Sequence, residues 1–104
     1  MKDPLKMLRQ VQQMQDKMSK VQKELETETV EASAGGGAVT VVASGTQKIV
    51  SVKIEPDAAS DHEMLQDLVL AAVNEAMEKS KQMAAAKMQS VASGLGLPPG
   101  MLGF

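Results

Sequence analysis

The residues of this chain best suited to chemistry are the lysines and the arginine near its amino terminus. Residues 1–23 contain six basic residues against two acidic ones, Asp3 and Asp16, which gives this segment a net charge of +4. The basic residues are Lys2, Lys6, Arg9, Lys17, Lys20 and Lys23. Clustered lysine and arginine side chains are typical of surfaces that contact phosphate groups. An ordinary solvated helix face is the alternative, and the residues alone leave both interpretations open.

The rest of the chain is acidic, and the formal net charge of all 104 residues is −2. Four glutamates follow the basic segment, and residues 55–78 carry only acidic charges. The four are Glu24, Glu26, Glu28 and Glu31. Charge is therefore segregated along the chain, and this separation, more than the net charge, indicates where an anionic partner would bind.

The chain offers few groups for catalysis or for binding a metal. It contains no cysteine, and its single histidine, His62, lies in an acidic stretch where a solvated side chain is expected. No nucleophile, base and orienting group can be assembled from these residues. We therefore predict that the protein is not an enzyme and has no catalytic residue, no metal site, no cofactor and no small-molecule substrate.

Composition also excludes two other classes of function. There is no tryptophan or tyrosine and only one phenylalanine, Phe104, which disfavours stacking on unpaired bases. No apolar run approaches the ~20 residues that span a bilayer, and the first residues lack the apolar core of a signal peptide. We expect a soluble cytoplasmic protein with no membrane partner.

The basic residues lie on a predicted long helix. Asp3 and Pro4 are typical of a helix start, and the apolar residues that follow are spaced by four and three, as in a heptad seam. They are Met7, Val11, Met14, Met18, Val21 and Leu25. A seam of this kind requires a helical partner.

Three short strands are predicted next. Alternation of apolar and polar residues indicates strands over 30–34, 38–44 and 49–54, with Val50, Val52 and Ile54 on one face of the third and Ile49, Ser51 and Lys53 on the other. Gly35 to Gly37 open into a strand, whereas a phosphate-binding loop opens into a helix, so we interpret them as a hairpin turn.

A second long helix is predicted after the strands. The Ser60-x-x-Glu63 spacing resembles a capping box, and a broad apolar stripe from Leu65 to Ala76 is typical of a helix lying on a sheet. About 30 helical residues extend ~45 Å, whereas a seven-residue strand spans ~23 Å, so roughly half of the helix must overhang. We predict one domain over residues 1–93, a Gly/Pro-rich mobile tail over 94–104, and a homodimer that covers the exposed apolar seams.

Four motifs in order resemble the YbaB/EbfC family of small bacterial nucleoid-associated proteins. They are Gly35-Gly36-Gly37-Ala38-Val39, Val52-Lys53-Ile54-Glu55-Pro56, the segment from Leu65 to Ala76, and Gly94-Leu95-Gly96-Leu97-Pro98-Pro99-Gly100. The resemblance covers essentially the whole chain. It implies an α-β-β-β-α chain that dimerises through its sheet, with helices projecting as arms. It also implies DNA binding that alters DNA conformation, with roles in nucleoid organisation and gene regulation. Family members often carry a lysine where Thr40 stands here, so the arms must supply more of the affinity.

These observations define candidate sites. The predicted function is duplex DNA binding by a homodimer at the bacterial nucleoid, through phosphate contacts with weak sequence selectivity, because one arginine and no base-stacking residue offer little for base readout. The candidate DNA-binding residues are Lys2, Lys6, Arg9, Lys17, Lys20, Lys81 and Lys87. The candidate dimer-interface residues are Val39, Val41, Val50, Val52, Leu68 and Ala72. The alternative is a helical-arm adaptor or chaperone, similar in plan to prefoldin, that does not bind DNA.

Overall fold

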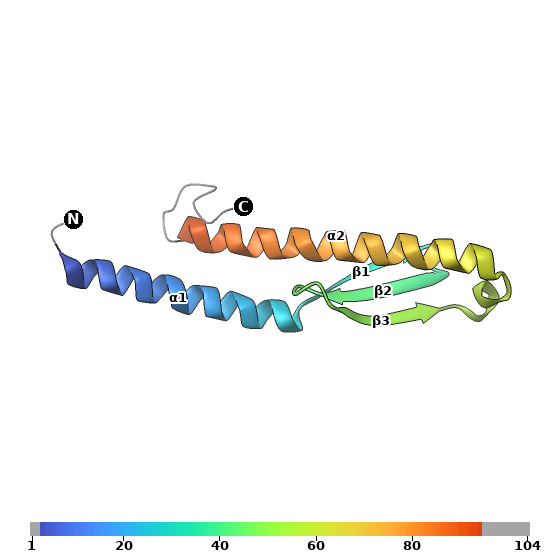
Figure 1. Ribbon diagram of the computed structural model, residues 1–104, viewed down its shortest axis with the longest axis horizontal. Helices are drawn as coiled ribbons and strands as arrows, with labels where there is room; N and C mark the ends of the chain where they lie inside the picture. Colours follow the sequence, from blue (N-terminus) through green and yellow to red (C-terminus); the bar gives the residue numbers. More distant parts are fainter. Residues whose placement is uncertain (1–2, 95–104) are drawn as a thin grey trace.

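The computed structural model describes residues 3–94, and they form an α-β-β-β-α chain as predicted (Figure 1). The elements are α1 (Pro4–Thr27), β1 (Thr29–Ala34), β2 (Val39–Ser44), β3 (Ile49–Ile54), the short 3₁₀ helix η1 (Pro56–Ser60) and α2 (His62–Gly94). The molecule is elongated, with extents of 69 × 21 × 15 Å and a radius of gyration of 19.2 Å. A compact chain of this length would have a radius of about 13 Å. Gly94 still belongs to α2, and the rest of the predicted tail lies outside the described residues.

Helix α1 begins and ends where its residues dictate. The Asp3 side chain accepts hydrogen bonds from the backbone N–H groups of Leu5 and Lys6, at 3.1 and 3.2 Å, and Pro4 occupies the first turn. The helix ends at Thr27, and Glu28 is already extended. The next residues, Thr29 and Val30, are β-branched and favour a strand.

The three strands form an antiparallel sheet in the order β1-β2-β3. Gly35, Gly36 and Gly37 have φ angles of 66°, 65° and 95°, a conformation that glycine adopts without strain, which confirms the hairpin turn. The register between β2 and β3 shifts at Val42 and Ala43, so that Ile49 lies opposite Ala43. The simple alternation predicted for the third strand was therefore wrong for Ile49, because this bulge moves Ile49 to the face that it shares with Val52 and Ile54.

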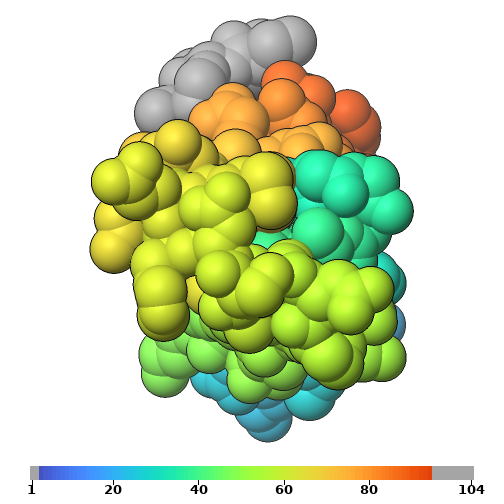
Figure 2. Space-filling model, turned by 90° about the vertical axis from the view of Figure 1, so that its right-hand side faces the viewer, coloured from blue at the N-terminus to red at the C-terminus, as the bar shows by residue number. Residues whose placement is uncertain are grey.

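The start of the second helix also differs from the prediction. The residue that caps α2 is Asp61, whose carboxylate accepts a hydrogen bond from the backbone N–H of Met64 at 3.1 Å. The predicted cap, Ser60, instead ends η1 and donates its hydroxyl to the carbonyl of Asp57. Figure 2 shows the sheet end of the molecule, viewed along the long axis. The yellow-green residues at its centre belong to the end of β3, to η1 and to the start of α2.

Helix α2 packs on β1 and β2 with its first half. The core between them consists of Ala32, Val39, Val41, Ala43, Ala72 and Ala76, and the half-buried Val30, Ala34, Leu65, Leu68, Val69 and Val73 pack against it. Its 33 residues extend about 50 Å, whereas a six-residue strand spans about 20 Å, so the second half of the helix extends past the sheet.

The overhanging half of α2 packs against the second half of α1 in the same chain (Figure 1). Val21, Leu25 and Val91 are buried there, surrounded by Met18, Met83, Ala84 and Met88. Part of the heptad seam therefore finds its helical partner within one chain. The first half of α1 extends further, and its apolar side chains are exposed: Leu5, Met7, Leu8 and Val11.

Candidate nucleic-acid interface

The fold converts charge segregation along the chain into two ends of opposite charge. The sheet end, residues 28–80, carries nine acidic against three basic residues, a net charge of −6. The arms, formed by residues 3–27 and 81–94, carry seven basic against four acidic residues, a net charge of +3. A polyanion would therefore be attracted to the arms and repelled by the sheet end.

Most of the predicted DNA-binding residues on α1 share one side of the helix. Lys6, Lys17 and Lys20, with Gln10 and Gln13 between them, follow the spacing of three and four that places side chains on the same face. Arg9 lies next to this face, and all four cationic side chains are exposed. We call Lys6, Arg9, Lys17 and Lys20 the basic face of α1. Lys2 lies outside the described residues.

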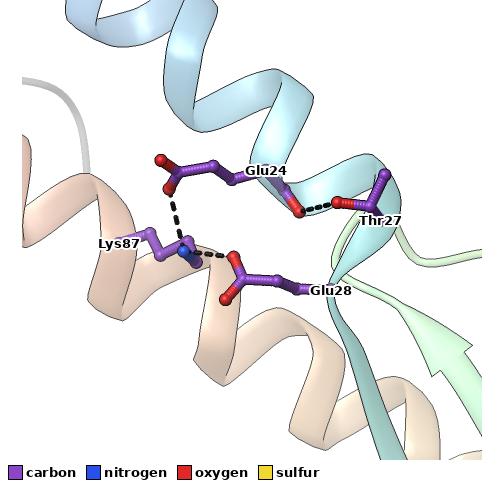
Figure 3. A network of polar contacts seen from close by, with 4 residues as sticks. All are labelled: Glu24, Thr27, Glu28 and Lys87. Carbon is purple, nitrogen blue, oxygen red and sulfur yellow. Dashed lines mark hydrogen bonds and ion pairs between the residues drawn. The ribbon is translucent and has the colours of Figure 1, made fainter.

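The two predicted residues on α2 have different environments. Lys81 is exposed. Lys87 lies between the carboxylates of Glu24, in the last turn of α1, and Glu28, just after that helix (Figure 3). Its ammonium group is 2.9 Å from Glu24 and forms an ion pair with Glu28. The hydrogen bonds that Lys87 donates to Glu28 and then to Glu24 raise the pKa of Lys87. The hydrogen bond from Lys87, together with its charge, lowers the pKa of Glu24. These contacts hold Lys87 at the junction of α1 and α2.

The predicted dimer-interface residues fall into two groups. Val39 and Val41 on β2 and Ala72 on α2 are completely buried between the sheet and α2 within a single chain. Leu68 is half-buried against the turn at Gly35. In this conformation the three buried residues are core rather than surface. The other two, Val50 and Val52, are exposed on β3 by 60% and 45%.

The exposed surface around Val50 and Val52 contains apolar residues that were not on the list of candidates. Ile49 and Ile54 are also exposed on β3, because α2 covers β1 and β2 and leaves β3 open. Residues on α2 line an apolar groove of about 450 Å³: Leu65, Gln66, Val69, Leu70 and Val73. The β-branched composition of β3 was visible in the sequence, but its position at the uncovered edge depends on how α2 lies on the sheet.

The two edges of the sheet are not equivalent. On β1, the Lys79 ammonium donates a hydrogen bond of 2.9 Å to the backbone carbonyl of Glu31. Lys79 is held in turn by Glu75, one helical turn earlier. A charged side chain at an edge strand hinders pairing with another strand. The opposite edge, β3, carries the exposed apolar residues.

Within residues 3–94 no three histidine, cysteine, aspartate or glutamate side chains are grouped so that they could hold a metal ion. In the same part of the chain no helix has the length and apolarity needed to cross a membrane.

Comparisons with known proteins agree on one family. The model of the YbaB/EbfC DNA-binding family matches residues 1–95. A nucleoid-associated protein of Acetivibrio thermocellus is 52% identical over 97 residues, which cover 91% of this chain and 86% of that protein. A second nucleoid-associated protein, from Syntrophobacter fumaroxidans, is 50% identical over 93 residues, which cover 88% of this chain and 84% of that protein. The crystal structure of an uncharacterized Helicobacter pylori protein has the same fold, with a TM-score of 0.76 at 18% identity over 86% of this chain and 97% of that one.

Proposed function

Because the chain belongs to the YbaB/EbfC DNA-binding family, we propose that it binds double-stranded DNA as a homodimer in the bacterial nucleoid. The observation that carries the proposal is the basic face of α1, on an arm that projects from an acidic sheet end. Binding alters DNA conformation and so affects nucleoid organisation and gene expression. The protein acts in the cytoplasm, where the nucleoid lies.

Contacts with backbone phosphates supply most of the affinity. The basic face contains three lysines and the chain's single arginine, Arg9. Lysine binds phosphate as a point charge, whereas the bidentate reading of guanine favours arginine. Selectivity for sequence is therefore weak. Lys87 does not belong to the contact surface, because Glu24 and Glu28 already bind its ammonium group.

The homodimer forms through the apolar surface that β3 and α2 leave open, which consists of Ile49, Val50, Val52 and Ile54 with Leu65, Val69, Leu70 and Val73. Soluble monomers rarely expose this much apolar surface on neighbouring elements. A second copy is the partner that fits, because it offers the same apolar residues and the same unpaired edge. The β1 edge, with Lys79 across it, remains outside the interface.

Dependence of affinity on salt tests the phosphate contacts. If the basic faces of a dimer neutralise about six to eight phosphates, the affinity falls by about 10³- to 10⁴-fold between 50 and 200 mM salt, since the slope of log K against log salt is roughly −0.9 per phosphate. Fluorescence anisotropy with a labelled duplex measures this slope. The matched variants are Lys6→Gln with Lys17→Gln on the arm, and Lys48→Gln with Lys53→Gln on the sheet end, which remove equal charge. Only the arm pair should weaken binding, and equal effects would contradict the proposal.

Substitution of Val52 tests the interface. Val52→Asp places a charge in the apolar surface, and the dimer should dissociate to the monomer mass of 11.0 kDa. Ser51→Asp is the control, because Ser51 lies opposite Val42 on the other face of β3. Light scattering coupled to gel filtration gives both masses. A Val52→Asp protein that remains dimeric would exclude this surface.

The prefoldin-like adaptor keeps one observation in its favour, the exposed apolar residues Leu5, Met7, Leu8 and Val11 on the arm. A protein bound to DNA leaves the high-mass fractions of a cell extract after nuclease treatment, whereas an adaptor bound to proteins stays there. Nuclease release therefore separates the two functions.

A further inference from the structure

A groove of about 280 Å³ lies between α1 and α2, next to the junction held by Lys87. Its lining residues are Lys17, Lys20, Val21, Glu24, Ser90 and Val91. Two lysines of α1 thus border the same space as one serine of α2, and one valine from each helix also lines it. Such a volume holds several water molecules at ~30 Å³ each, so a phosphate group fits.

The Lys17 side chain lines this groove, and its ammonium group reaches the described end of α2. A Cβ atom built on Gly94 would stand 3.7 Å from the Lys17 Nζ atom, which places this ammonium against the end of α2 that the structure describes. Lys20 lies one helical turn further along the same face of α1. Ser90, one turn before Gly94, is exposed and lies on the opposite wall of the groove.

The acidic residue of the groove, Glu24, offsets only part of its positive charge. The Glu24 carboxylate accepts a hydrogen bond of 2.9 Å from Lys87, which lies outside the groove lining. The pKa of Glu24 is lowered by Lys87 and, to a lesser degree, by Lys20, so this carboxylate stays ionised. Its hydrogen-bond partner is Lys87. With Glu28 included, the cluster around the groove contains three lysines and two glutamates. Its net charge of +1 matches the single negative charge of a phosphodiester.

We propose that this groove holds one phosphate of the DNA backbone between Lys17, Lys20 and Ser90. The inference rests on the proposed function and adds to it Ser90, an uncharged residue on the second helix. The two ammonium groups supply the attraction, and the Ser90 hydroxyl donates a hydrogen bond that fixes the position of the phosphate. Serine is a common donor to backbone phosphates. Because its donors come from both helices, the site exists only while α1 and α2 are docked.

Variants of Ser90 test the inference, with duplex affinity measured at several salt concentrations. Ser90→Ala removes the donor and should lower affinity about tenfold without changing the salt slope, because no charge is altered. Ser90→Glu places a carboxylate between the two lysines, so affinity should fall further and the slope should decrease by about 1.8 per dimer, one phosphate being lost in each chain. Gln89→Glu adds the same charge one residue away on exposed surface and should change affinity less than about threefold.

The outcomes separate this inference from the proposed function. If the unmodified protein binds the duplex and the Ser90 variants bind equally well, the groove is not a phosphate site, although DNA binding stands. If Gln89→Glu weakens binding as much as Ser90→Glu, the effect is one of general charge and the inference also fails. If the unmodified protein does not bind the duplex, both proposals fall. Titration with inorganic phosphate, followed by NMR of the Ser90 and Val91 amides, then shows whether the groove takes free phosphate instead.

Discussion

Replacement of Gly45 by alanine should displace α1 from the sheet without changing any charge. Gly45 follows β2, and its backbone N–H donates to the carbonyl of Glu28 at 3.0 Å. A Cβ atom built there would stand 2.5 Å from Leu25 Cδ2 and 3.0 Å from both the Cβ atom and the carbonyl oxygen of Leu25. The Cδ2 methyl can rotate away, but the carbonyl oxygen moves only if the end of α1 moves with it.

The expected size of this effect follows from the crowding. Gly45 is not among the glycines with a positive φ, so backbone strain adds nothing. An extra methyl in a closely packed site costs typically about 1–3 kcal/mol. For a domain of this size each kcal/mol lowers the melting temperature by about 4–8 °C, so Gly45→Ala should lower it by roughly 4–24 °C.

Thermal unfolding followed by circular dichroism measures the change, at one protein concentration because a dimer melts at a concentration-dependent temperature. Gly36→Ala is the control: its Cβ atom meets nothing within 4 Å, and its φ of 65° costs about 1–2 kcal/mol through strain alone. Hydrogen exchange should speed up at the end of α1 in Gly45→Ala and not in Gly36→Ala. In a Leu25→Ala background, Gly45→Ala should cost less, because Cδ2 is gone. A Gly45→Ala protein with unchanged melting temperature and exchange would refute this reasoning.

Two further predictions concern Lys87. The pKa of Glu24 is lowered from its ordinary 4.5 and that of Lys87 is raised from its ordinary 10.5. The cluster should therefore stabilise the fold fully between these values, lose the Glu24 contribution as the pH falls below 4.5 and lose the Lys87 contribution as the pH rises above 10.5. Urea unfolding across the pH range checks the sign, and the change should disappear when Lys87, Glu24 and Glu28 are replaced by Met, Gln and Gln. The same triple variant should keep the salt slope of DNA binding, whereas a Lys87 that contacted one phosphate in each chain would lower that slope by about 1.8.

The secondary structure followed from local sequence, because each element has a start and a periodicity of its own. The heptad spacing of Met7 to Leu25 predicted α1, and the glycines after Ala34 predicted the first hairpin. The missed details were also local in origin. One extra residue near Val50 forms a bulge that changes the face of Ile49, and Asp61 rather than Ser60 caps α2. The alternation of apolar residues and the spacing of capping residues are compatible with either of two positions one residue apart. The sequence alone therefore could not locate the bulge or the cap.

The sites were less predictable, since they depend on contacts between distant residues. Basic residues on α1 were identified from composition, but the engagement of Lys87 depends on Glu24, 63 residues away in the chain. Likewise, Val39 and Val52 were grouped as candidate interface residues, and the sequence did not reveal that α2 covers Val39 and leaves Val52 exposed. Ser90 has no charge and no motif, and only the docking of α1 on α2 brings it to Lys17 and Lys20.

In the proposed homodimer, the distribution of charge limits how a duplex can lie. The two sheet ends meet at the centre and bring together a net charge of −6 from each chain, whereas each pair of arms carries +3. The phosphates of a duplex lying across the centre of the dimer would be repelled by the acidic sheet ends. The phosphates of a duplex bound by the arms would not be repelled in this way. In this proposed dimer the apolar surface of β3 joins the two chains. It also sets the distance between the basic faces of the two chains, which hold the DNA. A dimer joined through the β1 edge would space the same basic faces differently and would bury the Lys79 ammonium.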